Sequence, residues 1–394
     1  MKTNRKVLII YASFGDGHRQ VTRALEESFL REGGTDVMTV DLLAEAHPWM
    51  NAVTRTMYTR SSQYSPALYG WSYRFTEHLQ YDRFLVKWLN SLGSRRLKEL
   101  IQAEQPDAII HTFPILPLLE LRKKKGWALP AVTVLTDYVL HQRWVHPETD
   151  QYYVATDELQ TELLAQGIAK ERVRVTGIPI RNAFQRSLDA DEIVSRYGLA
   201  PGRKLVLLMA GAYGVLSDID DIVRSLLQMD NIQVMLVCGK NEPLLHKMQA
   251  LFPDEPRLAL FGYVDHVEEL MKVASCMVTK AGGVTLSEAL AIGLPFIVYR
   301  PLPGQEQGNA RFLAESGFGC IANDVEAIRR QLERILALPP RDEMASAGAE
   351  DRSMDAAALI VSDVMELMDR AAHSQPLLLP AKPKRRKALH GNLN

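Results

Sequence analysis

Short apolar runs alternate along the chain with stretches in which apolar residues recur at helical spacing. In the first half, most of the runs are almost continuously apolar, as strands buried on both faces of a sheet require. These expected strands are Lys6 to Tyr11, Asp36 to Asp41, Asp107 to His111, Ala131 to Leu135, Gln151 to Val154 and Arg172 to Val175. Strands of this kind, with helices between them, predict a parallel α/β sheet.

The same alternation restarts after a stretch punctuated by Gly and Pro, which is typical of a linker between domains. The second set of expected strands is Leu205 to Leu208, Val234 to Val237, Leu258 to Phe261, Cys276 to Thr279 and Phe296 to Tyr299. A second parallel α/β sheet follows from this pattern. We therefore expect a first domain over residues 1–176, a linker over 177–203 and a second domain over 204–345.

The end of the chain carries two further features. Apolar residues recur at helical spacing from Met354 to Met368 and predict a docked amphipathic helix within residues 346–372. Residues 373–394 contain Lys and Arg but no acid, and they predict a basic, disordered tail.

Length and composition agree with two globular domains. The chain has 394 residues, of which 47% are hydrophobic and 24% charged, with a net charge of −1. This composition excludes collagen-like, disordered and disulfide-scaffold proteins and gives no global indication of nucleic-acid binding. Neither a signal peptide nor an apolar run of the roughly 20 residues that a spanning helix needs is expected. The cysteines lack metal-site spacing and are expected as reduced core residues of a cytoplasmic protein: Cys238, Cys276 and Cys320.

The segment from Ala46 to Lys98 interrupts the alternation of strands and helices, and it is unusual in its aromatic content and its charge. It holds ten of the chain's 29 aromatic residues, where an even spread would place about four, and eight Lys and Arg against two acids. Basic and aromatic side chains together suit an anionic lipid surface, where each cation contributes about 1 kcal/mol. Ordinary helix packing with a solvated basic face accounts for the same pattern, and both interpretations stay open. The residues expected at a lipid surface are Arg55, Arg60, Trp71, Arg74, Arg83 and Trp88.

Two residues at strand ends are candidates for catalysis in the first half. His18 follows the first strand and the glycines Gly15 and Gly17, at the start of a helix, where its pKa class suits proton transfer near neutral pH. The surrounding residues do not form the GxGxxG pattern, so dinucleotide binding gains little support. Asp137 follows another strand, and an N-cap role accounts for it about as well as catalysis. The histidines after it lack the spacing of a strong metal site.

The second half carries the strongest signal for ligand binding. After an expected strand, Lys280 leads into Gly282 and Gly283, and a helix expected from about Thr285 would direct its N-terminal dipole at a diphosphate. Glu288 lies one turn further, where a carboxylate can accept hydrogen bonds from ribose hydroxyls. A capping box with Thr285 is the alternative. Asp218 and Asp220 resemble a metal-binding DxD pair but are interpreted as helix capping.

Six ordered motifs resemble the monogalactosyldiacylglycerol synthase and processive diacylglycerol glucosyltransferase group of glycosyltransferases. The motifs are SFGDGHRQ, TDYVLHQRWVHPETD, VTGIPIR, FGYVDHVEELM, TKAGGVTLSEALA and PGQEQGNARF. The resemblance covers nearly the whole chain and implies the GT-B architecture, in which two Rossmann-like parallel-sheet domains face a cleft. It also implies that the chain is related to the lipid-II N-acetylglucosaminyltransferases. The loop of Gly211 holds fewer glycines than its counterpart in plant relatives.

The resemblance implies a role for each half. The first domain would take the acceptor, with His18 activating its hydroxyl and Asp137 assisting. The second would bind a UDP-sugar, and Lys240 or Lys280 with a helix terminus could replace a divalent ion, so no metal or other cofactor is expected. The implied donor contacts are Phe261 to Val264 with uracil, Gly282, Gly283 and Thr285 with the diphosphate, Glu288 with ribose, and Gln305, Glu306 and Asn309 with the hexose.

These implications favour an inverting transferase that moves a hexose from a UDP-sugar to diacylglycerol, either as a single sugar or processively. Glucose is the favoured hexose. The enzyme would lie on the cytoplasmic face of the cell membrane. A lipid-II-type transferase and a UDP-sugar epimerase would share the donor motifs, but an epimerase would not need a lipid-facing segment. A non-catalytic UDP-sugar-binding regulator is the alternative from another class.

Overall fold

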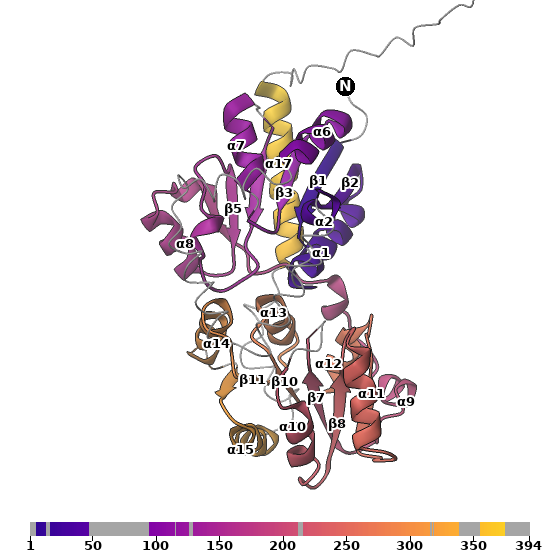
Figure 1. Ribbon diagram of the computed structural model, residues 1–394. Helices are drawn as coiled ribbons and strands as arrows, with labels where there is room; N and C mark the ends of the chain where they lie inside the picture. Colours follow the sequence, from indigo (N-terminus) through magenta and orange to yellow (C-terminus); the bar gives the residue numbers. More distant parts are fainter. Residues whose placement is uncertain are drawn as a thin grey trace, which may run out of the picture.

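The structure, a computed structural model, describes residues 5–12, 16–46, 94–114, 116–125, 129–211, 216–315, 317, 319–338 and 355–374. It contains two α/β halves, one above the other in Figure 1, each built on a six-stranded sheet. This is the expected class of fold. Arg55, Arg60, Trp71, Arg74, Arg83 and Trp88, and the tail after Ser374, lie outside the described residues.

The first sheet has the order β2-β1-β3-β4-β5-β6, and all its neighbouring strands are parallel. Its strands are β1 (Arg5–Tyr11), β2 (Thr35–Asp41), β3 (Ala108–His111), β4 (Ala131–Val134), β5 (Gln151–Val154) and β6 (Val173–Val175). Every residue of β3 and β4 is buried, which explains their unbroken apolar runs.

The second sheet has the order β12-β11-β10-β7-β8-β9 and is also parallel throughout. Its strands are β7 (Lys204–Met209), β8 (Ile232–Val237), β9 (Leu258–Phe261), β10 (Cys276–Thr279), β11 (Phe296–Tyr299) and β12 (Gly319–Ala322). The eleven expected strands are confirmed, but β12 was not expected. It is a half-buried edge strand that begins with glycine, so its four residues lack a strong apolar run.

Helices cover both faces of each sheet (Figure 1). The first half contains α1 (Asp16–Glu32), α2 (Leu42–Ala46), α6 (Ser94–Glu104), α7 (Leu116–Lys125) and α8 (Asp157–Ala165), with 3₁₀ turns η1 (Gln142–Trp144) and η2 (Lys170–Arg172). After η3 (Asn182–Phe184) come α9 (Ala190–Arg196), α10 (Ile219–Leu226), α11 (Glu242–Leu251), α12 (Val267–Val273), α13 (Gly283–Ala291), α14 (Gln305–Glu315) and α15 (Val325–Leu336).

The last described helix, α17 (Ala356–Ser374), returns to the first half and packs beside α1 (Figure 1). Its apolar face joins the core around β1 and α1, so the expectation of a docked helix is confirmed. Arg31 pairs with Asp355 at 2.9 Å, and Arg174 pairs with Asp363. The chain therefore passes between the halves twice, once after β6 and once before α17.

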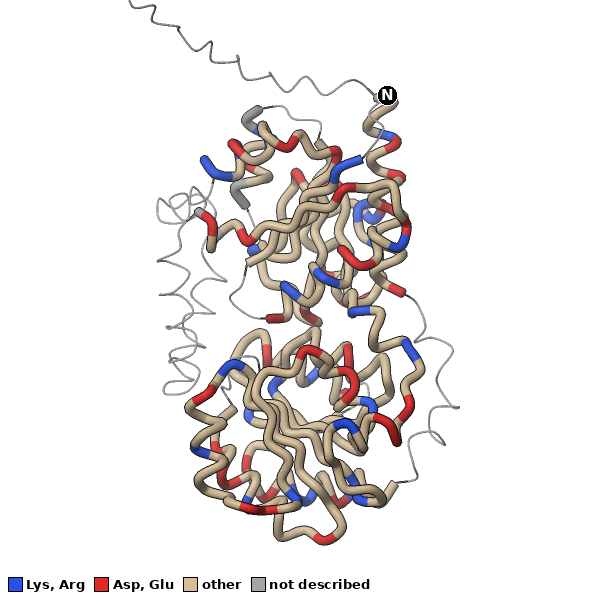
Figure 2. The backbone as a smooth tube through the Cα atoms, turned by 90° about the vertical axis from the view of Figure 1, so that its right-hand side faces the viewer, with Lys and Arg blue, Asp and Glu red and all other residues tan. Residues whose placement is uncertain are grey.

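Charged residues of both signs are intermixed over the described parts of the two halves (Figure 2). The cysteines are free thiols, with Cys238 and Cys276 buried and Cys320 half-buried. Among the described helices, none combines the length and apolar character needed to cross a bilayer.

Candidate active site

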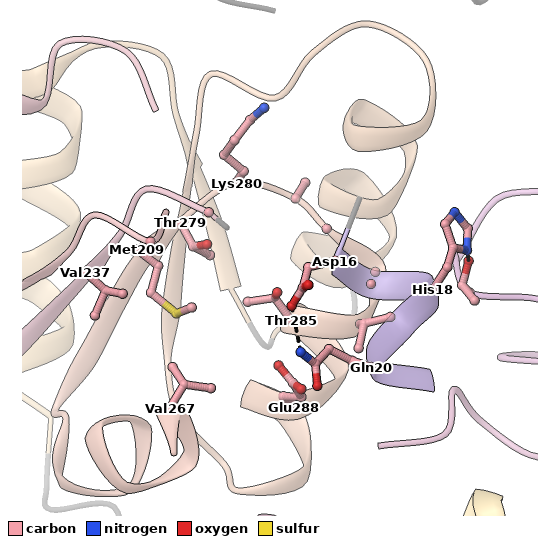
Figure 3. Close-up of a pocket in the computed structure, with 18 of the residues that line it drawn as sticks. Asp16, His18, Gln20, Met209, Val237, Val267, Thr279, Lys280, Thr285 and Glu288 are labelled. Carbon is pink, nitrogen blue, oxygen red and sulfur yellow. Dashed lines mark hydrogen bonds between the residues drawn. The ribbon is translucent and has the colours of Figure 1, made fainter. Parts of the chain in front are cut away.

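A cavity of about 410 Å³ lies between the two halves, where the strands of both sheets end. The first half contributes residues of α1 and of the segments after β3 and β4, and the second half contributes the segments after β7 to β10 and the start of α14. Figure 3 shows Asp16 and Gln20 of α1 beside Thr285 and Glu288 of α13. The expected residues on its lining are His18, Asp137, Gly211, Val264, Lys280, Gly282, Gly283, Thr285, Glu288, Gln305 and Glu306.

His18 lies in the first turn of α1 and is one of the lining residues, and Figure 3 shows its ring on the side of α1 away from Thr285 and Glu288. Its Nδ1 is 2.6 Å from the carbonyl oxygen of Thr112, which can only accept, so Nδ1 carries the proton. Nε2 is then the unprotonated nitrogen of the neutral ring. Burial lowers the pKa of His18, whereas the charge of Asp137 and the bond to Thr112 raise it in part. The imidazole is therefore neutral near pH 7 and can accept a proton at Nε2.

Asp137 follows β4 and is buried at the point where the two halves meet. Its Oδ1 accepts a hydrogen bond from Asn309 Nδ2 at 3.0 Å, and its Oδ2 accepts one from Thr136 Oγ1 at 3.4 Å. The first of these bonds comes from the second half of the molecule, so the carboxylate is held from both sides of the cleft.

The N-terminus of α13 points its backbone N–H groups into the cavity. Gly282 is the N-cap in an extended conformation, and the helix begins at Gly283. The capping-box alternative for Thr285 and Glu288 is therefore wrong, because the cap lies three residues before Thr285. A Cβ atom on Gly283 would lie 2.4 Å from the carbonyl oxygen of Thr136 and 3.0 Å from Asp137 Oδ1. Only glycine lets the helix approach the first half this closely.

Glu288 lines the cavity one turn further along α13 and is 4% exposed. Burial raises the pKa of its carboxyl to about 8, with Arg181 lowering it in part. The guanidinium of Arg181 also pairs with Glu268 at 2.9 Å, and both of these side chains are buried. The site therefore keeps two carboxyl groups and one guanidinium in a desolvated wall.

Lys280 and Glu306 form an ion pair at 3.0 Å on the cavity lining. Glu306 also accepts a hydrogen bond from the backbone N–H of Leu302 at 3.1 Å, which fixes the start of α14. Gln305 lies beside this pair on the lining. A cation and a carboxylate are thus available next to the glycine turn.

Three of the expected donor residues lie off the lining. The ammonium of Lys240 sits 4.8 Å from the ring centroid of Tyr263, which lines the cavity. Phe261 packs edge-on against Tyr197 with ring centroids 5.7 Å apart. Asn309 is completely buried behind the lining.

Several lining residues were not expected from the sequence. Arg181 stands in the VTGIPIR motif, which carries the family resemblance and runs into the expected linker, but no role in the site was expected for it. Asp16 and Gln20 surround His18 in the helix and share a hydrogen bond of 2.6 Å. Their helical spacing from His18 was the available signal, because residues on the first turns of one helix end share its surroundings.

The aspartates of the DxD pair have other partners than the expected cap. Asp218 stands at the expected N-cap position of α10, but its side chain makes no capping bond and accepts a hydrogen bond from Tyr299 Oη at 2.8 Å instead. Asp220 lies in the first turn of α10 and pairs with Lys247 at 3.2 Å. Within the described residues, no group of three His, Cys, Asp or Glu side chains is placed to hold a metal ion.

Comparisons with known proteins agree with this geometry. Residues 18–180 match the family model for monogalactosyldiacylglycerol (MGDG) synthase, and residues 213–360 match the glycosyltransferase family 28 C-terminal domain. The processive diacylglycerol beta-glucosyltransferases of Bacillus cereus (strain AH187) and Bacillus thuringiensis (strain Al Hakam) are each 40% identical over 337 residues. That alignment covers 85% of this chain and 87% of each relative.

Solved structures show the same architecture at low identity. The S. aureus MnaA–UDP co-structure has a TM-score of 0.62 at 16% identity and covers 94% of this chain and 99% of that one. MurG of Acinetobacter baumannii has a TM-score of 0.58 at 15% identity, with coverage of 92% and 99%. The fold is therefore GT-B.

Proposed function

The chain belongs to the family of processive diacylglycerol β-glucosyltransferases, and on that premise we propose that it transfers glucose from UDP-glucose to the hydroxyl group of diacylglycerol. The enzyme is a UDP-sugar-dependent hexosyltransferase. In the reaction, the acceptor oxygen forms a bond to C1 of the sugar while the bond from C1 to the β-phosphate oxygen breaks. UDP leaves with that electron pair, and C1 is inverted.

The observation that carries the proposal is that His18 and the N-terminus of α13 line the same cavity from opposite halves. The neutral His18 ring has its free nitrogen available for the proton of the acceptor hydroxyl. Proton transfer makes the ring cationic, and the charge of Asp137, which raises the pKa of His18, stabilises that cation. Asp137 is therefore proposed as the partner of the base.

The leaving diphosphate is proposed to lie on the glycine turn at Gly282 and Gly283. Free N–H groups and the helix dipole favour negative charge at that point, and Lys280 stands next to it. The charge that develops on UDP in the transition state would be stabilised there without reorganisation of the protein. Glu288 is proposed to bind the ribose hydroxyls, and Gln305 and Glu306 the hexose.

The acceptor is proposed to reach the cavity from a membrane surface. Its acyl tails cannot leave a bilayer cheaply, because each exposed CH₂ group costs about 0.8 kcal/mol. The basic and aromatic segment from Ala46 to Lys98 has the composition for that surface. We place it on the anionic cytoplasmic leaflet, with the second half free to move.

The proposal is tested with purified protein, radiolabelled UDP-glucose or UDP-galactose, and vesicles that contain diacylglycerol. Thin-layer chromatography of the lipid products gives both the sugar and the number of sugars added. A β-glucosyl lipid made only with the full set of substrates is the expected result. UDP-N-acetylmannosamine formed from UDP-N-acetylglucosamine, or transfer only to a polyprenyl-linked acceptor, would contradict it.

A further inference from the structure

A carboxamide of the second half reaches across the cleft into the first. Asn309 in α14 is fully buried, and its Oδ1 accepts a hydrogen bond from the backbone N–H of Tyr138 at 2.8 Å. Its Nδ2 donates to Asp137 Oδ1 and to the carbonyl oxygen of Ala281, each at 3.0 Å. The N–H of Tyr138 can only donate and the carbonyl of Ala281 can only accept, so these partners fix the orientation of the amide.

These bonds occupy both donors of the carboxamide and one of the two acceptor positions of its oxygen. Both N–H bonds of Asn309 and its oxygen have protein partners, and the side chain lies off the cavity lining. A hexose hydroxyl that accepts a hydrogen bond from Nδ2 would have to displace Asp137 or Ala281, whereas Oδ1, which accepts one bond here, can accept a second. Inside a desolvated interface, leaving such a partner unsatisfied is costly.

The packing around Asn309 fits a closed arrangement of the two halves. Gly308 meets Val139 so closely that an added Cβ would lie 2.3 Å from Val139 Cγ1. The ring of Tyr138 stacks on Phe312 with centroids 5.1 Å apart, and its Oη is 2.8 Å from Ser287 Oγ. Separation of the halves would break the Asn309 bonds to Asp137 and Tyr138 together.

We infer that Asn309 is a positioning residue that, only while the two halves are closed, holds the carboxylate of Asp137 against Thr136, whose Oγ1 lies 3.2 Å from His18 Nδ1 and 3.4 Å from Asp137 Oδ2. Closure of the cleft and alignment of the pair of catalytic groups are then one event. The inference rests on the proposed function, because it takes from it the role of Asp137 as the partner of the base. It assigns Asn309 a role in catalysis through Asp137, beside the hexose contact that the family resemblance implies.

The test compares Asn309→Ala with wild type in steady-state kinetics and in amide hydrogen exchange. Loss of the carboxamide frees Asp137 to turn away, and a misplacement of about 1 Å can cost about 10²-fold in rate. We expect kcat to fall about 10- to 100-fold while KM for UDP-glucose changes less than about twofold. Exchange at the Tyr138 amide should become faster, because its acceptor is gone.

Ser287→Ala is the matched control. It removes another hydrogen bond across the same interface, the one to Tyr138 Oη, but leaves the Tyr138 amide and Asp137 with their partners. We expect its kcat to stay within about threefold of wild type, with unchanged exchange at Tyr138. Thermal unfolding of both variants shows that each is folded when it is assayed.

Two outcomes would overturn the inference. If Asn309→Ala raised KM for UDP-glucose about tenfold with kcat and UDP affinity retained, Asn309 would be a hexose-binding residue. If the substitution left both kcat and exchange at the Tyr138 amide unchanged, Asn309 would hold neither the Asp137 carboxylate nor that amide. Failure of the proposed function is seen separately: wild type would then transfer no glucose to diacylglycerol, whereas the exchange experiment would still report whether the interdomain contact forms.

Discussion

At the scale of single residues, the site depends on how burial sets the protonation of two groups. Burial lowers the pKa of His18 and raises that of Glu288, because removal from water disfavours the charged form of each. His18 is thereby neutral and able to accept a proton, and Glu288 holds a proton up to about pH 8.

We expect His18→Ala to leave UDP affinity nearly intact and to lower kcat by about 10² to 10⁴-fold, the usual contribution of a general acid or base. The reason is that His18 is proposed to act on the acceptor, whereas the diphosphate is proposed to lie at α13. Calorimetry with UDP and rate measurements on vesicles separate the two effects. A fall in kcat of less than about tenfold would mean that another group, with Asp137 as the first candidate, removes the proton.

Glu288→Gln should make the protein more stable above about pH 8 but a weaker ligand binder. The native pKa of about 8 exceeds the unfolded value of 4.5, so the native state binds more protons between these values and stability falls as pH rises through that window. The variant has no such loss, and urea unfolding at about pH 5 and about pH 8.5 should show the difference only at the higher pH.

Burial favours the protonated form of the Glu288 carboxyl group, whereas binding of the ligand should favour its deprotonated form. Ribose hydroxyls donate to a carboxylate, so wild-type affinity for UDP-glucose should rise from about pH 6.5 to about pH 8.5, and the Glu288→Gln affinity should be lower and flat. A wild-type affinity that is equally flat, in a folded protein, would argue against a ribose contact.

The sequence predicts the residue types of the site well but not their partners. Gly282, Gly283 and Lys280 stand directly after an apolar run, so strand periodicity alone places them at a sheet edge. Arg181 reaches the cavity from the linker, and its partner Glu268 is 87 residues away in the chain. Contacts of that separation depend on how the two sheets face one another, which no local pattern encodes.

At the scale of elements, the first turn of α13 serves two purposes. Its N–H groups are proposed to bind the diphosphate, and it packs directly on Thr136 and Asp137 of the first half. The sequence predicts this helix, but with its start near Thr285, because Gly has low helix propensity and the first apolar positions follow it. The structure begins the helix two residues earlier because close approach, not propensity, selects glycine there.

We expect Gly283→Ala to hinder closure, because the new methyl group would meet a backbone oxygen at 2.4 Å that has no flexible end to move. Turnover should fall about 10²-fold, with a smaller change in UDP affinity. Gly282→Ala is the comparison, since its Cβ meets nothing nearer than Thr285 Oγ1 at 3.9 Å. Equal losses in the two variants would show that the glycine turn acts through flexibility or ligand contact rather than through the interface.

The edge strand β12 and the helix α17 show why elements differ in how well they can be predicted. β12 has four half-buried or small residues and is defined by its pairing with β11. The long apolar face of α17 is visible in the sequence, but its docking on α1 is not. An amphipathic pattern predicts that one face of a helix is buried, but it does not identify the element against which that face packs.

At the scale of the whole molecule, the two crossings of the chain define how the halves can move. The first follows β6 and the second precedes α17, which is anchored on the first half by its apolar face and by ion pairs at Arg31 and Arg174. Under the proposed function, the second half would carry the donor and rotate relative to the first half while α17 stays docked. Contacts of Asn309 and Gly283 mark the closed end of that motion.

Membrane attachment through the first half would leave that rotation free, and the segment from Ala46 to Lys98 belongs to the first half by its place in the chain. Reversal of Arg55, Arg60, Arg74 and Arg83 to Glu should therefore reduce sedimentation with phosphatidylglycerol vesicles and lower activity on vesicles, while UDP affinity stays unchanged. Salt should imitate the variant in part, because exposed charges are screened over a Debye length of about 8 Å at physiological ionic strength.

Deletion of the tail after Ser374 is the control for this prediction, because it removes a second cluster of Lys and Arg without touching the segment. If the arginines hold the enzyme on the lipid, the deletion should sediment with vesicles nearly as well as wild type. The assignment is reversed if the deletion alone abolishes vesicle binding while the four-Glu variant binds normally. The tail would then be the anchor, and because it follows α17 on the first half, rotation of the second half would still be unhindered.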